Sequence, residues 1–577
     1  MSGNLILFAP SVRTNFGFGH LKRCLKWAHH LKADLFWPQG NGFFTQQDSL
    51  VSNYPDANII ANLPENEIYD LVVLDQRKTS VETQKMLLKV GKILIGLDEG
   101  GEMRTTLPFL VDTLDNLNPR RPNKKSTNFL DLGSNLPIQS SETSSLLVSF
   151  GGEDPQDLTG LFYDFWVNHG WNHMDVTVVL GPYFKQKGPY PGWKTLDSPP
   201  SLQEILPLYG SLVTSYGITA WEGVTAGLLT LLINPSPYHQ KLGLKAGFPS
   251  LLKNDLKENL FYPAWASREE SLLRLRTHLN TEQGNFPTFL ESFHHSPDFC
   301  PLCHSKNRKI IARDEHKTYS RCSECTMVYL TTFNLPEKKY TKTYFHEEYQ
   351  KQYGRTYLED FDHIKSMGKE RVRCINSLLQ TPGGNLLDAG CAYGPFLAAA
   401  KDGGMRPFGL DVASDAIIFI KEKLGFPGVE KSLLNLDWSG DFPGAGELEA
   451  LTLWYVIEHF PDLDPLLRVI NKNLKLGGLL AFSTPHGQGI SGLFSPQKFY
   501  HESPEDHFSI WSPKIAKKVL KRFGFQVKKI RITGHHPERF PGLKKSRGFL
   551  YEIISALSSC LGWGDTFEVY ARKVKNL

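Results

Sequence analysis

Short apolar runs alternate with amphipathic segments along residues 1 to about 285. The runs are rich in Leu, Val and Ile, and amphipathic stretches such as 20–31 and 218–226 separate several of them. Continuous apolar strands between helices are typical of a parallel β-sheet that is covered on both faces. In chain order, the predicted strands are LILFAP, DLVVLD, KILIGLD, SLLVSF, VTVVLG, SLVTSY and LTLLIN.

Two polar, turn-rich breaks divide this pattern. The break at 115–143 predicts two Rossmann-like halves, residues 1–140 and 141–290. The break at 276–299 leads into a cysteine-bearing segment, which we place at 296–332.

The alternation resumes after a polar, aromatic stretch at 331–380 that we expect to be mostly helical. From Asn385 onward the predicted strands are NLLDAG, FGLDV, ALTLWYV, LLAFSTP and a final FEVYARK. Residues 333–577 are therefore predicted to form a further domain. The predicted fold class is α/β, with three Rossmann-type domains and a small cysteine module.

Composition narrows the class of protein. The 577 residues are 41% apolar and 21% charged, which is typical of soluble globular proteins and excludes disordered, collagenous and coiled-coil chains. The 64 basic and 60 acidic residues give a net charge of +4, so there is no strong nucleic-acid signal. No run approaches the roughly 18–20 apolar residues of a transmembrane helix, and MSGNLILFAP lacks the features of a signal peptide.

Four of the eight cysteines form two closely spaced pairs, Cys300-x2-Cys303 and Cys322-x2-Cys325. Two such pairs can close a tetrahedral Zn²⁺ site of the ribbon type. With every ligand a thiolate, no position stays open for catalysis, so we predict a structural ion. The other cysteines are scattered, which indicates a reducing, cytoplasmic location rather than a disulfide framework.

A glycine turn follows the apolar strand that ends near Asp388. The sequence DAGCAYG places Gly390 and Gly394 where a ligand can approach the backbone. Asp411 ends the next strand, where its carboxylate can accept the ribose hydroxyls of a nucleoside. Asp437 and Trp438 are candidates to bracket an adenine ring. A Rossmann unit that binds NAD is the alternative for this pattern.

The ordered series of motifs from about 340 to 577 resembles the class I S-adenosylmethionine (SAM)-dependent methyltransferases, in the branch that acts on sugars and small molecules. The EHFPD block and the PEDHFS block, residues 504–509, match this branch and weigh against an NAD site. The resemblance implies a seven-stranded sheet, with Asp388, Gly390 and Gly394 at the methionine end of SAM. It also implies Asp411 on the ribose and Asp437 near the adenine.

A cysteine module directly before such a domain is also similar to sugar C-methyltransferases that act on nucleotide-activated deoxysugars. For the methyl acceptor, His459 is the predicted catalytic base because it follows a strand at the edge of the cofactor cleft in this family. A histidine that only orders the loop is an equal alternative. His507 and His486 are lower-ranked candidates for the base.

The first strand is followed by GFGHLKRCL, residues 17–25. Its glycines allow a turn, and His20 begins a helix at the strand ends where α/β sheets bind ligands. This pattern resembles the nucleotide-sugar hydrolase of pseudaminic acid biosynthesis and its relatives with the two-domain GT-B glycosyltransferase fold. The resemblance implies that His20 is the base for an attacking water, or alternatively a helix cap.

Two further blocks, SFGGEDP at 149–155 and YGITAWE at 216–222, also look like blocks of this family. A helix N-terminus at the second block can hold a diphosphate through its free amides. Asp75 and Asp98 end their strands facing the same cleft, as substrate contacts or as caps. The predicted substrate-binding residues are Gly19, Arg23, Gly151, Gly152, Gly217, Thr219 and Glu222.

Together these patterns predict a bifunctional enzyme of surface-glycan or nonulosonic-acid-type sugar biosynthesis. It would combine SAM-dependent methyl transfer to a sugar or nucleotide-sugar with nucleotide-sugar hydrolysis or glycosyl transfer. One alternative is an RNA or protein methyltransferase whose zinc module reads the macromolecule through Lys306, Arg308, Lys309, Lys317 and Arg321. The other is a non-catalytic, sugar-binding N-terminal half. The sequence carries no signal for an oligomeric state.

Overall fold

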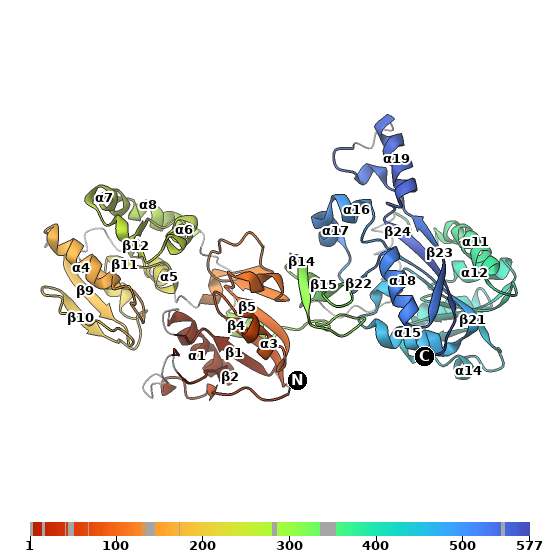
Figure 1. The fold of residues 1–577 in the computed structure, drawn as a ribbon, viewed down its shortest axis with the longest axis horizontal. Coiled ribbons are helices and arrows are strands. Elements are labelled where there is room, and N and C mark those ends of the chain that lie inside the picture. Colours follow the sequence, from red (N-terminus) through yellow and green to blue (C-terminus); the bar gives the residue numbers. More distant parts are fainter. Residues whose placement is uncertain are drawn as a thin grey trace. The chain divides into compact units, whose positions relative to one another are not determined.

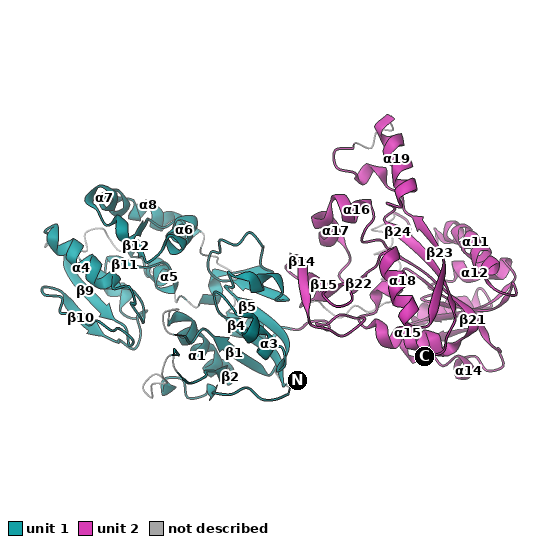
Figure 2. Cartoon of the chain, viewed as in Figure 1, with its two compact units in different colours: residues 1–293 teal, residues 294–577 magenta. Residues whose placement is uncertain are grey.

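The structure is a computed structural model of the chain. It describes residues 4–13, 18–40, 42–43, 51–66, 68–130, 132, 145–171, 174–277, 279, 285–334, 354–543 and 549–577. The chain divides into two compact units, Met1–Phe293 and His294–Leu577 (Figure 2). This boundary falls between the ends predicted for the second Rossmann-like half and the cysteine module. The finer division into four domains stays a prediction.

The first unit begins with a fully parallel sheet of order β3-β2-β1-β4-β5-β6-β7 (Figure 1). Its central strand β4 reads YDLVVLD and is buried over nearly its whole length, as expected of a strand covered on both faces. The strands are β1 (Ile6–Pro10), β2 (Asp34–Phe36), β3 (Asn58–Ile60), β4 (Tyr69–Asp75), β5 (Gly91–Leu97), β6 (Phe109–Asp112) and β7 (Lys124–Lys125). The helices that accompany them are α1 (Gly19–Leu31) and α3 (Val81–Leu87).

A second parallel sheet of the same unit has the order β10-β9-β8-β11-β12-β13. Its strands are β8 (Ser145–Ser149), β9 (Asp175–Leu180), β10 (Lys194–Asp197), β11 (Ser211–Thr214), β12 (Leu229–Asn234) and β13 (Ser250–Leu252). Its helices are α4 (Leu158–Asn168), α5 (Ile218–Thr225), α6 (Pro237–Ala246), α7 (Glu258–Ala266) and α8 (Arg268–Thr277). The chain returns to the first sheet through α9 (Phe286–Glu291), where Phe286 packs on Trp27 of α1.

The second unit contains the sheet β19-β18-β17-β20-β21-β24-β23. The strands from β19 to β21 are parallel, and β24 enters antiparallel beside β21. Its strands are β17 (Gly384–Ala389), β18 (Met405–Asp411), β19 (Gly428–Glu430), β20 (Leu448–Trp454), β21 (Leu474–Pro485), β23 (Phe525–Thr533) and β24 (Thr566–Lys573). Its helices are α11 (Phe361–Leu378), α12 (Pro395–Asp402), α13 (Ser414–Glu422), α14 (Trp438–Asp441), α15 (Leu463–Asn473), α16 (Ile490–Phe494), α17 (Pro496–Glu502), α18 (Pro513–Arg522) and α19 (Phe549–Leu561).

The cysteine module forms an antiparallel sheet of order β14-β15-β16-β22. The strands β14 (Arg308–Asp314), β15 (Lys317–Cys322) and β16 (Val328–Thr332) come from the module itself. The last strand, β22 (Ser509–Ile510), comes from the second half of the unit, and Val328 pairs with Ile510. Cys300, Cys322 and Met327 belong to the same apolar core as the large sheet. The module is thus part of the second unit's fold.

The predicted α/β class and its parallel, Rossmann-like sheets are confirmed. Within the stretch at 331–380 that is predicted to be mostly helical, α11 covers Phe361–Leu378, and residues 335–353 lie outside the described residues. Among the described helices, none is long and apolar enough to cross a membrane.

Candidate functional site

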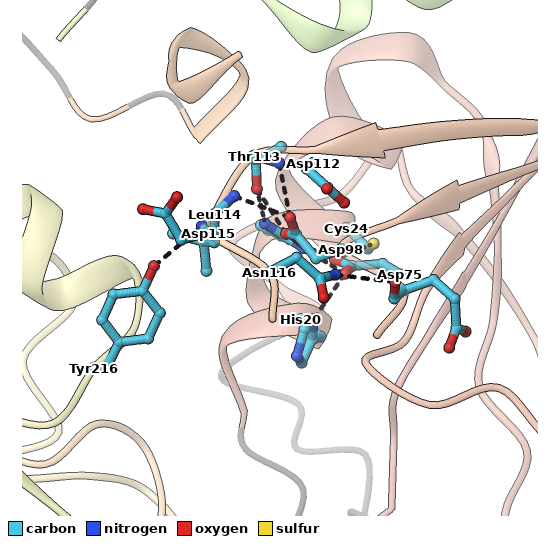
Figure 3. Close-up of polar contacts among 12 residues, drawn as sticks. His20, Cys24, Asp75, Asp98, Asp112, Thr113, Leu114, Asp115, Asn116 and Tyr216 are labelled. Carbon is cyan, nitrogen blue, oxygen red and sulfur yellow. Dashed lines mark hydrogen bonds and ion pairs between the residues drawn. The ribbon is translucent and has the colours of Figure 1, made fainter. Parts of the chain in front are cut away.

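His20 lies in the first turn of α1, at the carboxyl-terminal edge of the first sheet. Its ring is almost fully buried, and its Nδ1 lies 2.7 Å from Oδ1 of Asp75, the last residue of β4 (Figure 3). A carboxylate on one ring nitrogen fixes the orientation of an imidazole and leaves the other nitrogen for chemistry. This is the arrangement expected of an oriented base.

Arg23 lies one turn further along α1 and binds two strand-end carboxylates. It donates through Nε to Oδ2 of Asp75 (2.5 Å) and through Nη2 to Oδ2 of Asp98 (2.8 Å). Burial alone would raise the pKa of Asp75, but the charges of Arg23 and His20 hold it well below its usual range. Arg23 is itself buried and also donates to Thr113 (3.1 Å). In the structure the guanidinium of Arg23 is thus bonded to Asp75, Asp98 and Thr113, and its predicted role in binding substrate stays a prediction.

The motif loops of the two halves of the first unit lie next to one another. A Cβ added at Gly152 would lie 2.8 Å from the ring of Phe18, and one added at Gly19 would lie 3.8 Å from Ile218. The loop after β8 and the start of α5 are thereby brought to the start of α1, beside His20.

Two glycines at this edge have open space around them, and a hydrogen bond joins the two halves of the first unit. Among the described residues, nothing lies within 4 Å of a Cβ added at Gly151 or Gly217. The backbone amide of Asp115 donates to the hydroxyl of Tyr216 across the halves (3.1 Å, Figure 3). Thr219 and Glu222 lie half-buried in the first turns of α5. Gly19, Gly152 and the start of α5 thus lie at the edge that carries His20, and Oε1 of Glu222 accepts from Gln203 (3.2 Å); Gly17 of the motif lies outside the described residues.

In the second unit, the glycine turn after β17 is tied to the end of β18. The backbone amides of Ala392 and Ala413 donate to the two carboxylate oxygens of Asp411, each over 2.9 Å. Gly390 has φ +75°, and a Cβ there would lie 2.5 Å from Val456, so the turn needs glycine at this position. The turn thus presents its backbone beside the end of β20. Gly394, at φ +78°, begins α12.

Asp388, at the end of β17, is completely enclosed. Its Oδ1 accepts the hydroxyl of Thr452 (2.6 Å), and burial raises its pKa to about 7. Near a bound sulfonium, whose positive charge favours the ionised acid, the carboxylate form would be stabilised. The buried carboxylate of Asp388 and the glycine turn at Gly390 are therefore suitable for binding SAM.

Asp437 is exposed at the start of α14. The neighbouring Trp438 points into the core, stacks edge-on against Phe408 at 5.0 Å and donates from its indole to Gly446. Because the indole of Trp438 is buried, it does not cover an adenine ring. The proposal below therefore keeps only Asp437 as a neighbour of the adenine.

Four polar side chains gather where β20 ends. His459 closes a short 3₁₀ turn after β20, and its Nδ1 lies 3.3 Å from Oδ2 of Asp506. The ring of His507 lies edge-on to that of His459, with centroids 4.8 Å apart. Glu458 is completely buried, and burial raises its pKa to about 7 against the charge of His459.

His486 is built differently from this cluster. It is buried, and its Nδ1 is bonded to the carbonyl of Gly564 (2.9 Å), which gives it a structural role. Sequence reasoning ranked His507 low and did not single out Asp506. The signal was present in PEDHFS, but only the fold brings that segment to the end of β20.

The four cysteines of the two pairs converge at one point. Sγ of Cys300 lies 3.4 Å from that of Cys325, and Sγ of Cys303 lies 3.5 Å from that of Cys322. A disulfide would require about 2.05 Å. Thiolates about 2.3 Å from a tetrahedral ion lie about 3.8 Å apart, so this donor set fits Zn²⁺.

Residues 363–530 match the family model described as "Methyltransferase domain". With the sheet order given above, this region is a class I SAM-dependent methyltransferase domain, and that prediction is confirmed. A search of curated proteins finds no match to the sequence.

Solved structures with similar folds include two methyltransferases. A SAM-dependent methyltransferase from Archaeoglobus fulgidus is 20% identical, and the match, with TM-score 0.29, covers 39% of this chain and 98% of that one. Geranyl diphosphate C-methyltransferase from Streptomyces coelicolor A3(2) is 17% identical, with TM-score 0.26 over 36% of this chain and 78% of that one.

The pKa of Asp388 predicts how the second unit responds to pH without cofactor. A raised carboxyl pKa stabilises the fold below the unfolded value, about 4, and this contribution is lost as pH rises through about 7. The Asp388→Asn protein does not lose this stability. The melting temperature of the variant minus that of the wild type should therefore increase from pH 5 to pH 8, and differential scanning calorimetry measures this increase. Exposed Asp437→Asn is the control, and a difference for Asp388→Asn that stays constant with pH would contradict the assignment.

Proposed function

We propose that the chain is a bifunctional enzyme. Its second unit transfers a methyl group from SAM to a sugar or nucleotide-sugar, and its first unit hydrolyses or transfers a nucleotide-sugar. The observation that carries the proposal is the His459–Asp506 pair beside the glycine turn of the methyltransferase domain. Surface-glycan or nonulosonic-acid-type sugar biosynthesis is the setting that suits both halves.

The cysteine module supports a small acceptor over an RNA or protein. Of the basic residues that a reading surface would need, Arg308 is buried against Asp298, and Lys317 donates to the carbonyls of His501 and Ser503. Both charges are thus used inside the fold. Lys317 thereby holds the segment that leads to Asp506 and His507.

In the proposed methyl transfer, SAM and the residues of the chain have separate roles. SAM, when bound, supplies an electrophilic methyl on a sulfonium sulfur, which leaves as a neutral thioether. In the proposal the predicted cofactor residues, Asp388, Gly390, Gly394, Asp411 and Asp437, line its site. His459, oriented by Asp506, is the group that takes the proton of an acceptor hydroxyl or carbon acid.

In the first unit, the proposal gives His20 the role of base for the attacking water or acceptor. Asp75 fixes the ring, and Arg23 holds Asp75 ionised. The free amides at the start of α5 and the open space around Gly151 and Gly217 suit a diphosphate. Thr219 and Glu222, on the same helix turn, suit the nucleoside.

We propose a structural Zn²⁺ on Cys300, Cys303, Cys322 and Cys325. The ion would join the two cysteine-bearing turns of the module. Lys518 and Arg522 of α18 donate to the carbonyls of Cys325 and Leu302 in these turns, so the ion would also stabilise the contact with α18. With four thiolates the ion has no open position, so it takes no part in methyl transfer.

Removing one zinc ligand tests this role. Cys303→Ser should lose the one zinc ion per chain and lower the melting temperature of the second unit, because structural zinc contributes folding energy. Elemental analysis by mass spectrometry and calorimetry measure the two effects. The exposed Cys560→Ser is the matched control. Stoichiometric zinc in the Cys303→Ser protein would contradict the site.

Methyl transfer is tested with labelled SAM and a panel of nucleotide-sugars, with products identified by mass spectrometry. His459→Ala should lower kcat by about 10²–10⁴-fold, as expected for loss of an oriented base, and leave SAM affinity unchanged. Asp411→Ala should instead weaken SAM binding, measured by calorimetric titration. Methylation of RNA or protein but of no nucleotide-sugar would overturn the proposed acceptor.

Nucleotide-sugar turnover by the first unit is tested with His20→Ala. Release of nucleotide should fall by about 10²–10⁴-fold, measured by chromatography of the products. His30→Ala, an exposed histidine on the same helix, is the matched control and should retain full turnover. If the His20→Ala protein turns over substrate like the wild type, the first unit is not the proposed catalyst.

A further inference from the structure

Glu458 is a buried acidic residue of the methyltransferase domain. Its side chain is completely buried, and neither carboxylate oxygen makes a well-formed hydrogen bond to the described residues; the hydroxyl of Thr484 lowers its pKa, but by less than burial raises it. A buried carboxylate without strong hydrogen bonds loses the stabilisation that water gives it. A position that only packed the core would be filled better by an apolar side chain. The carboxylate therefore points to a partner that binds from outside the chain.

Two imidazoles stand beside this carboxylate. One oxygen of Glu458 and one ring nitrogen each of His459 and His507 lie within 4.8 Å of one another. Atoms that bind one ion at about 2.1 Å lie no more than about 4.2 Å apart, so small side-chain rotations bring the three together. Both histidines are partly exposed, whereas Glu458 lies beneath them. An ion held here would have a protein side and an open side.

We propose that Glu458, His459 and His507 bind a divalent transition-metal ion with open coordination positions. Two imidazoles and one carboxylate are a donor set for first-row ions such as Mn²⁺ or Fe²⁺. Mg²⁺ and Ca²⁺ prefer oxygen ligands and are disfavoured by the two nitrogens. This site is separate from the four-cysteine cluster, whose thiolates leave no open position.

Asp506 is in place to support such a site. Metal-binding histidines commonly pass their second ring N–H to a carboxylate, which fixes the ring. Asp506 lies 3.3 Å from Nδ1 of His459 and is itself almost buried. Asp506 is thus a positioning residue, whether His459 takes a proton or binds the ion.

This inference rests on the proposed methyl transfer and narrows its acceptor to a hydroxyl. An ion with open positions lowers the pKa of a hydroxyl that binds to it. The hydroxyl proton then leaves to water, the acceptor oxygen forms a bond to the methyl carbon, and the carbon–sulfur bond breaks with its electron pair going to sulfur. The products are the methyl ether, the neutral thioether and one proton. In this form of the site His459 is a ligand, and the ion replaces it in activating the acceptor.

Binding of Mn²⁺ to the full-length, zinc-loaded chain tests the site without any substrate. Thiolates are poor ligands for Mn²⁺, so the cysteine cluster does not compete. Electron paramagnetic resonance of free Mn²⁺ should show saturable loss of about one equivalent on adding the protein. Glu458→Gln and His507→Ala should each weaken binding by at least about tenfold, whereas a Mg²⁺ competitor should be ineffective.

His501→Ala is the matched control. His501 lies on the neighbouring helix α17, and its side chain pairs with Asp314 on the surface, so Mn²⁺ affinity should be unchanged. Glu458→Gln preserves the size of the side chain, and its calorimetric melting curve separates lost binding from unfolding. The site is overturned if the wild type binds no Mn²⁺, or if a folded Glu458→Gln protein binds it like the wild type.

Activity distinguishes failure of this inference from failure of the proposed function. Methylation that persists in enzyme whose only bound metal is the zinc of the cysteine cluster, with Mn²⁺ binding absent, leaves the methyltransferase proposal intact and overturns the ion. Methylation that requires added Mn²⁺ and yields a methyl ether supports the inference. Specific Mn²⁺ binding with no methylation of any nucleotide-sugar supports the ion and overturns the proposed acceptor class.

Discussion

The pairing of β16 with β22 is the contact that holds the segment of Asp506 and His507 in the methyltransferase domain. β22 has only two residues, and it begins two positions after His507. So short a strand is stable only as the edge of a larger sheet, and the cysteine module supplies that sheet. The packing of Tyr319 on Tyr500 and the bonds of Lys317 to the carbonyls of His501 and Ser503 fix the rest of the segment. The four cysteines and the acceptor histidines are therefore linked through one small sheet.

The first unit positions its histidine by charge instead. Asp75 and Asp98 end neighbouring parallel strands, so their carboxylates meet at one edge, and Arg23 joins them. A buried arginine between two carboxylates is stable only if its N–H groups are satisfied, and Thr113 completes that set. The rigidity that His20 needs follows from this pairing.

Much of the fold could be predicted from the sequence because continuous apolar strands and glycine turns are local signals. The strand that ends at Asp388 and the carboxylate of Asp411 were identified in this way. Arg23 was predicted to bind substrate and Trp438 to bracket an adenine, and the structure shows both side chains buried, because a motif does not show which side chains turn inward. Asp506 could not be linked to His459 at all, since 46 positions separate them and only the β16–β22 contact brings them together.

Glu458 shows what local patterns leave out. The EH pair at the end of an apolar strand indicates two polar residues at a sheet edge. Their exposure nevertheless differs, because His459 is partly exposed and Glu458 is buried. A short 3₁₀ turn, Ile457–His459, produces this difference by turning Glu458 inward after the strand. Stability alone would disfavour an acid there, because the contact with Thr484 offsets only part of the desolvation. Glu458 lies beside His459 and His507, where the proposed ion would balance its charge.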